Sequence, residues 1–237
     1  MLRSTTMTTE AALYRLLTWL SPSYPVGAYS YSHGLEWAVE EGLVRDRDGL
    51  VAWLAVVLRH GGGWQDAVLL AHGHEAVRAG DEVRWRELRA LAQALAATAE
   101  LALETRAQGE AFARASLASW PDPDARLVGL TAGGEDGPAL TYPLAVAATA
   151  ACHGVPLALV LPAYLQAFTA NLVSAAVRLV PLGQTDGQRA LAALEPVVGE
   201  VAARAPAVPL DELGTAALMV DLCSMRHETQ YTRLFRS

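Results

Sequence analysis

The stretch ALTYPLAVAATAACHGVPLALVLPAYLQAFTANLVSAAV, from Ala139 to Val177, carries no Asp, Glu, Lys or Arg. A membrane-spanning helix needs roughly 20 predominantly apolar residues in one run. This stretch is interrupted by Pro143, Gly154, Pro156 and Pro162, and it also contains amide and hydroxyl side chains. It therefore predicts two helices packed in the core of a globular protein, and no membrane span.

Helical periodicity continues towards the N-terminus from this stretch. Apolar residues recur at helical spacing from Leu50 to Val57 and again from Trp85 to Leu95. Asp46 or Asp48 precedes the first of these runs, and Asp81 precedes the second. Aspartate is a preferred N-cap because its carboxylate accepts hydrogen bonds from the first free amides of a helix. Both runs are therefore predicted to be helices.

The same reading applies towards the C-terminus. Residues Thr185 to Gln188 fit the capping-box pattern of a helix start. A last helix is expected over roughly Asp211 to Ser224. The longest loop is expected from Pro121 to Leu140. Alternating strand patterns are nearly absent. The prediction is a single all-α domain spanning residues 1–237, with about eight to ten helices.

Composition excludes several classes of function. All 18 basic residues are arginine, so the chain has no lysine for a nucleotide-binding phosphate loop or a Schiff base. The net charge of −7 makes a nucleic acid a poor partner. Two cysteines are too few for a disulfide framework, and the first residues lack the apolar run of a secretion signal. We expect a cytoplasmic protein.

Nucleophiles and metal ligands are scattered along the chain. Ser32 and His33 are adjacent, and no GxSxG elbow is present, which disfavours an acyl-transfer enzyme. Cys223 and His227 are four residues apart and would share a helix face if the last helix reaches that far. His153 is a third candidate ligand. No spacing supplies the three or four ligands of a tight metal site.

The stretch from Ser21 to Gly34 combines prolines, glycines and tyrosines in a turn that leads into a helix. Tyr29 and Tyr31 carry aromatic hydroxyls, a side-chain type enriched at protein interfaces. Glu36 falls in the first turn of the following helix, where a carboxylate can simply stabilise the helix start. A structural loop and a partner surface are both open for this stretch.

The final stretch, residues 225–237, contains side chains that anchor interfaces. These are Arg226, Tyr231, Arg233, Leu234, Phe235 and Arg236. A solvated tail is possible, because chain termini are usually poorly ordered unless something holds them. The aromatic content favours a tail that becomes ordered on a partner.

Several blocks of the chain resemble the UreF family of urease accessory proteins. They are SPSYPVGAYSYSHGLE (Ser21–Glu36), EGLV (Glu41–Val44), ETRAQGEAF (Glu104–Phe112), NLVSAAVRLVPLGQTDGQ (Asn171–Gln188) and HETQYTRLFRS (His227–Ser237). The blocks follow the order of the family and span Ser21 to Ser237. One departure is Thr141, where the family often has His.

The resemblance implies an all-α protein that forms a homodimer and has neither catalytic activity nor a tightly bound cofactor. Its implied partners are UreD (also called UreH), the GTPase UreG and the subunits of apo-urease. Nickel would be in transit, entering urease in a step coupled to GTP hydrolysis that UreF modulates. The lack of lysine agrees with this assignment, because it leaves the nucleotide chemistry to a partner.

The resemblance also suggests which residues bind partners. Tyr29 and Arg233 match family positions at which recruitment of UreG is expected. The weaker companions, placed by proximity, are Tyr31, Glu36 and Arg236. Tyr231 and Phe235 of the tail complete the predicted partner-binding residues.

Three alternatives stay open from the sequence. The first is a nickel-binding metallochaperone that uses His227, Cys223 or His153. The second is an arginine that acts directly on nucleotide bound to UreG. The third is a free-standing hydrolase.

Overall fold

The computed structural model describes residues 7–122, 124–132 and 138–237, and this part of the chain forms helices and no strand. The α-helices are α1 (Thr9–Trp19), α2 (Leu35–Glu40), α3 (Arg47–His60), α4 (Gly62–Ala79), α5 (Glu82–Ala94), α6 (Ala99–Ser119), α7 (Arg126–Thr131), α8 (Tyr142–Cys152), α9 (Leu157–Leu179), α10 (Gln184–Arg204) and α11 (Leu218–His227). Short 3-10 helices are η1 (Ala28–Ser30), η2 (Ala205–Ala207) and η3 (Leu210–Glu212).

The predicted all-α domain is confirmed. The described residues form 11 α-helices, of which α2 and α7 have only six residues each. The number is therefore close to the expected eight to ten. The first residues, in which no secretion signal was recognised, and the middle of the predicted loop over 121–140 lie outside the described residues.

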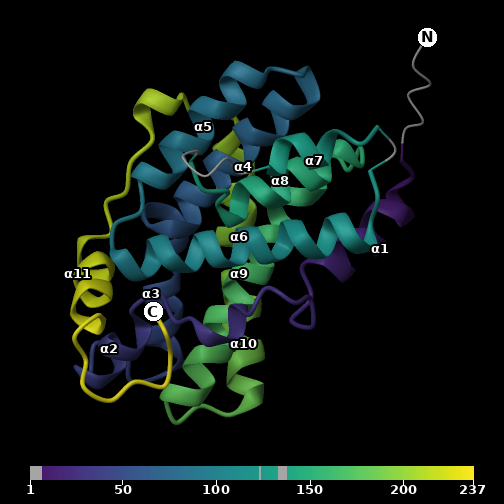
Figure 1. Cartoon of the computed structure of the whole chain (residues 1–237). Coiled ribbons are helices and arrows are strands. Elements are labelled where there is room, and N and C mark those ends of the chain that lie inside the picture. Colours follow the sequence, from purple (N-terminus) through teal and green to yellow (C-terminus); the bar gives the residue numbers. More distant parts are fainter. Residues whose placement is uncertain (1–6, 123, 133–137) are drawn as a thin grey trace.

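The uncharged stretch forms the two core helices α8 and α9, as predicted. Helix α8 packs against α4 and α6 (Figure 1), and nine of its residues are buried. Helix α4 approaches it closely at Gly73, where a Cβ atom would lie 2.7 Å from Leu144 Cδ2. Among the described residues, α9 alone is long and apolar enough to cross a membrane. It packs against α1, α3, α4 and α10, as a core helix does.

Two predicted helix starts are confirmed. The carboxylate of Asp46 accepts a hydrogen bond from Gly49 N (2.8 Å), and that of Asp81 accepts one from Arg84 N (2.9 Å). Each bond satisfies an amide that has no partner within its own helix.

Three predicted boundaries are wrong. Helix α10 begins at Gln184 with Gly183 as its N-cap, so Thr185 lies inside the helix and does not cap it. The last helix runs from Leu218 to His227, because the chain before it is held extended by a bond from Ala216 N to His60 O (2.7 Å).

The third boundary concerns the predicted loop over 121–140, which contains helix α7. Asp122 makes this helix possible, because its carboxylate accepts hydrogen bonds from Arg126 N (2.6 Å) and Leu127 N (3.0 Å). The side chain thereby satisfies two of the first amides of the helix, which have no acceptor within the helix itself.

The end of the chain returns to a region near its beginning. Helix α11 and the residues that follow it lie beside α2, as the yellow and dark blue elements of Figure 1 show. Main-chain hydrogen bonds join Arg236 N to Ser30 O (2.8 Å) and Ser32 N to Ser237 O (2.7 Å). Two motifs far apart in the sequence are thereby brought together.

Candidate functional site

The candidate site forms where residues 228–237, the C-terminal segment, contact residues 21–34, the tyrosine loop. Close packing of the helices behind it depends on Gly34. This residue has φ +73°, and a Cβ atom there would lie 2.6 Å from Ser224 N on α11. Glycine is the residue that meets both requirements, because it has no Cβ and adopts positive φ readily.

Glu36 holds the C-terminal segment against α2. Its carboxylate is buried and accepts hydrogen bonds from Leu234 N (2.6 Å) and Phe235 N (2.8 Å). Its Oε2 also lies 3.2 Å from His227 Nε2. These partners belong to α11 and to the segment, so the carboxylate of Glu36 does more than stabilise the start of its own helix.

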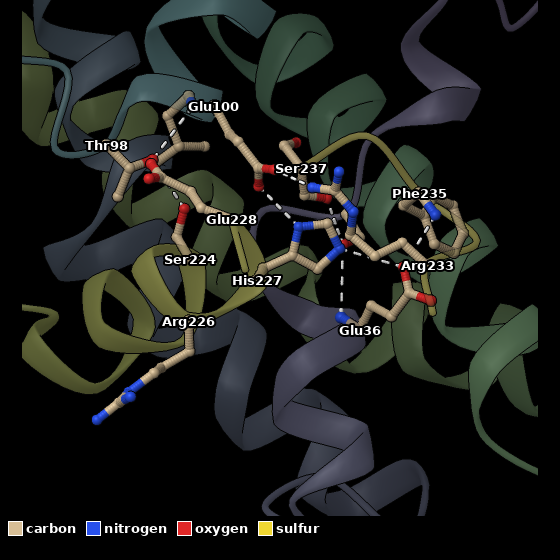
Figure 2. Close-up of polar contacts among 12 residues, drawn as sticks. Glu36, Thr98, Glu100, Ser224, Arg226, His227, Glu228, Arg233, Phe235 and Ser237 are labelled. Atoms are coloured by element: carbon tan, nitrogen blue, oxygen red, sulfur yellow. Dashed lines mark hydrogen bonds and ion pairs between the residues drawn. The ribbon is translucent and has the colours of Figure 1, made fainter. Parts of the chain in front are cut away.

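His227 lies between two carboxylates (Figure 2). Its Nε2 faces Glu36, and its Nδ1 lies 2.7 Å from Oε2 of Glu100 in the first turn of α6. A neutral imidazole has only one N–H, so both contacts are hydrogen bonds only if the ring is an imidazolium or one carboxylate is protonated. Glu100 also accepts a bond of 2.5 Å from Arg233 Nη1.

Glu104 lies one helical turn beyond Glu100. Its Oε1 accepts from His33 Nε2 and from Gln108 Nε2, both at 2.8 Å, and its Oε2 accepts from Ser237 Oγ at 2.6 Å. His33 has φ +54°, an uncommon value for a residue other than glycine. Burial lowers the pKa of His33, but the charge and hydrogen bond of Glu104 outweigh it, so this pKa is raised above its usual value.

Arg178, in the last turn of α9, touches both the loop and the segment. It donates a hydrogen bond from Nη2 to Tyr29 O (2.9 Å), and its guanidinium lies over the ring of Phe235. The Phe235 ring is buried. The tyrosine loop and the C-terminal segment are thereby tied to one helix.

The predicted partner-binding residues divide into two groups. Tyr29, Tyr231, Arg233 and Arg236 are exposed, with 68% of Tyr29 accessible to solvent. The other three residues, Tyr31, Glu36 and Phe235, are buried. Within the buried group, Glu36 and Phe235 hold the segment in position, while the exposed residues are accessible to a partner.

Sequence reasoning missed four residues of this site: His33, Glu100, Glu104 and Arg178. Glu100 and Glu104 are four residues apart, a spacing that places both carboxylates on one face of a helix. That spacing was the signal in the sequence that both carboxylates could contact one segment, here the C-terminal segment. Whether a partner orders the tail stays a prediction; in this structure the C-terminal segment lies on its own chain.

A cavity of about 300 Å³ adjoins the site, lined by residues of the tyrosine loop and of α4, α6, α8 and α9. Asp66 lies in its wall and accepts a hydrogen bond of 2.6 Å from the Tyr164 hydroxyl. Burial raises the pKa of Asp66 to about 6, against the lowering effects of this bond and of His33. Thr141 also lines the cavity, and its buried hydroxyl has no hydrogen-bond partner among the described residues.

The candidate metal ligands do not converge. Among the described residues, no three His, Cys, Asp or Glu side chains are arranged to hold a metal ion. Both ring nitrogens of His227 face carboxylates, and His153 contacts Arg15 Nη1 (2.6 Å) and Trp120 O (3.1 Å). Cys223 is buried, and burial raises the pKa of its thiol.

Comparison with known proteins finds relatives that align with nearly the whole chain. A family model described as UreF matches residues 44–195. The chain is 54% identical over 227 residues to the urease accessory protein UreF of Rhodopseudomonas palustris strain BisA53, covering 96% of this chain and 94% of that protein. It is 55% identical over 229 residues to the UreF of strain BisB5, with 96% and 92% covered. The UreF of Bradyrhizobium sp. strain BTAi1 is 51% identical over 226 residues, with 95% and 92% covered.

Proposed function

The chain belongs to the UreF family of urease accessory proteins, and on this premise we propose that it is a non-catalytic assembly chaperone for nickel insertion into apo-urease. It binds UreD (UreH), recruits the GTPase UreG and modulates GTP hydrolysis by UreG. It acts in the cytoplasm as a homodimer within this larger complex. Nickel is the cargo of the assembly, and the chain itself holds no resident cofactor.

The observation that carries this proposal is the exposed surface formed where the tyrosine loop meets the C-terminal segment. We call Tyr29, Tyr231, Arg233 and Arg236 the recruitment surface. Tyrosine and arginine are the residue types that dominate binding energy at protein interfaces. Hydrogen bonds from the segment to Glu36 and Glu104 hold its backbone in place, so it meets a partner with little further loss of conformational entropy.

Charge suggests what this surface binds. The chain has a net charge of −7, yet two arginines project from the segment. Arginine pairs well with carboxylates, so the complementary surface of UreG is expected to be acidic. Arg233 is already hydrogen-bonded to Glu100, which supports a docking role for this arginine over direct action on nucleotide.

The cavity is the proposed route of the nickel ion. Asp66 and Glu104 supply carboxylates in its wall, and His33 supplies an imidazole. A cargo ion must be released again, so dispersed single ligands suit its passage better than a closed set would. The separation of the candidate ligands therefore supports a conduit over a metallochaperone that stores nickel.

The test of the recruitment surface is co-purification of UreD and UreG with variants of the full chain. Tyr29→Ala and Arg233→Ala are expected to retain UreD and to lose UreG. Tyr14→Ala is a matched control, because Tyr14 on α1 has the same 68% exposure as Tyr29. Arg189→Ala, at an exposed arginine of α10 paired with Asp186, is the control for charge. Retention of UreG by both test variants would disprove this surface.

Equilibrium dialysis of the untagged chain tests the conduit. We expect no nickel ion to be held tightly in a 1:1 complex. One tightly bound nickel per chain, lost in His227→Ala, would instead establish the metallochaperone.

A further inference from the structure

The carboxylate of Glu104 joins two features that are otherwise separate. Its Oε1 accepts hydrogen bonds from His33 and Gln108, both of which line the cavity. Its Oε2 accepts from Ser237 in the C-terminal segment. We infer that Glu104 is a positioning residue that couples the cavity to the segment, so that a divalent cation in the cavity weakens docking of the segment. This inference rests on the proposed function, which makes the cavity the nickel route.

Glu104 depends strongly on its three hydrogen-bond donors. Only 3% of the residue is exposed, and within the described residues it forms an ion pair with His33 and with no arginine. A buried carboxylate is costly unless hydrogen bonds and an opposite charge compensate for the lost water. Any change in the donors on the cavity side therefore alters the hold of this carboxylate on Ser237.

A divalent cation changes the cavity side in a definite direction. It attracts the Glu104 carboxylate and competes for it with the ring of His33, whose Nε2 lies 2.8 Å from Oε1 of Glu104. Asp66 on α4 also lines the cavity and supplies a second carboxyl group there. The carboxylate of Glu104 turns towards the cation, and Ser237 loses its acceptor.

The coupling reaches the recruitment surface through the segment. Arg233 belongs to the segment, and Phe235 of the segment packs against Arg178, which holds the main chain of Tyr29. Because linkage is reciprocal, a partner that holds the segment in its docked position lowers the affinity of the cavity for the cation by the same factor. Recruitment of a partner would thus favour release of the cargo ion.

The first test needs no metal and uses hydrogen exchange of the purified full chain, followed by mass spectrometry. Gln108→Leu removes a donor to Glu104, and within the described residues Gln108 makes no side-chain hydrogen bond to the segment. We expect amide exchange of residues 234–237 to become about 3- to 10-fold faster, because the charged carboxylate of Glu104 loses its hydrogen bond from Gln108. Gln65→Leu is the matched control, since Gln65 lines the same cavity without bonding Glu104. Equal exchange in Gln108→Leu and the unaltered chain would overturn the coupling.

The second test adds nickel chloride to the untagged chain. Exchange of residues 234–237 is expected to accelerate with nickel, and this response is expected to be lost in Glu104→Gln. No change, or slower exchange, in the unaltered chain would overturn the cation as the trigger. Both measurements are made without UreG. A failure of UreG recruitment would therefore count against the proposed function and leave the coupling to be judged on its own.

Discussion

The guanidinium of Arg178 lies over the ring of Phe235, with 4.4 Å between its central carbon and the ring centroid. Helix α9 therefore contacts the C-terminal segment through Arg178. The same guanidinium donates to Tyr29 O, which fixes an exposed tyrosine beside that segment. A residue that is not itself part of the recruitment surface thus sets the geometry of the surface.

Replacing Arg178 is expected to weaken recruitment without removing any residue of the surface. Arg178→Ala loses a cation–π contact and a hydrogen bond, which together predict about a 10-fold rise in the Kd for UreG. Arg178→Lys is expected to recover part of the affinity, because an ammonium can still reach Tyr29 O but lacks the planar fork. Titration calorimetry of UreG into the complex with UreD measures both, with Arg189→Ala as control. Unchanged affinity in Arg178→Ala would contradict the prediction.

His227→Ala is expected to lower the free energy of unfolding by about 2–4 kcal/mol. The substitution leaves Glu36 and Glu100 buried near each other with their shared donor removed, and breaking a buried ionic contact is strongly destabilising. Urea denaturation followed by circular dichroism measures the loss. His60→Ala, at an exposed histidine in the last turn of α3, is expected to change stability by less than about 0.5 kcal/mol. Similar losses in the two variants would refute the structural role of His227.

The parts of the fold that were predictable are those fixed by local chemistry. Asp46 and Asp81 cap their helices with their own side chains, and such signals lie within four residues of their targets. The uncharged stretch that forms α8 and α9 reports burial directly. The boundaries of α11 were missed, because the bond from Ala216 to the end of α3 is a tertiary contact that no local pattern contains.

The site was predictable in its residue types and not in its pairings. Tyr29 and Arg233 are predicted to bind a partner from the blocks that contain them, and this role stays a prediction. The contact between Glu36 and the amide of Leu234 joins positions 198 residues apart, and helical periodicity says nothing about such a distance. Nothing in the sequence around Glu104 indicates that one of its oxygens faces the cavity and the other faces the C-terminal segment.

The close approach of α6 to the start of α8 gives a prediction for Gly109, with Gly129 as its control. A Cβ atom at Gly109 would lie 2.1 Å from Leu140 O, a main-chain atom that cannot swing aside. Gly109→Ala is expected to lower the free energy of unfolding by about 3 kcal/mol or more. Gly129→Ala, in α7 with open space around it, is expected to stabilise the protein by roughly 0.5 kcal/mol. Thermal unfolding compares the two, and equal melting temperatures would contradict the packing.

Asp66 gives a prediction for the dependence of stability on pH. Its pKa is raised to about 6 in the folded chain, chiefly by burial, so the folded state binds a proton that the unfolded state releases near pH 4. Stability therefore declines as pH rises from about 4 to about 6, and the full cost remains above that range. Asp66→Asn keeps an acceptor for the Tyr164 hydroxyl and has no charge to bury.

The gain in free energy of unfolding from Asp66→Asn should accordingly grow between pH 4.5 and 6.5 and then level off at about 1–2 kcal/mol. This gain is smaller than the full pKa shift would give, because the carboxylate borders the cavity. His33, Glu104, Tyr142 and Tyr164 also face this region, so the gain is read as a difference between two proteins that share them. Urea titrations at intervals across this pH range measure it. Asp211→Asn, at an exposed carboxylate of η3, should show no gain that varies with pH. A constant gain for Asp66→Asn, or one that shrinks as pH rises, would mean that Asp66 is not held protonated in the fold.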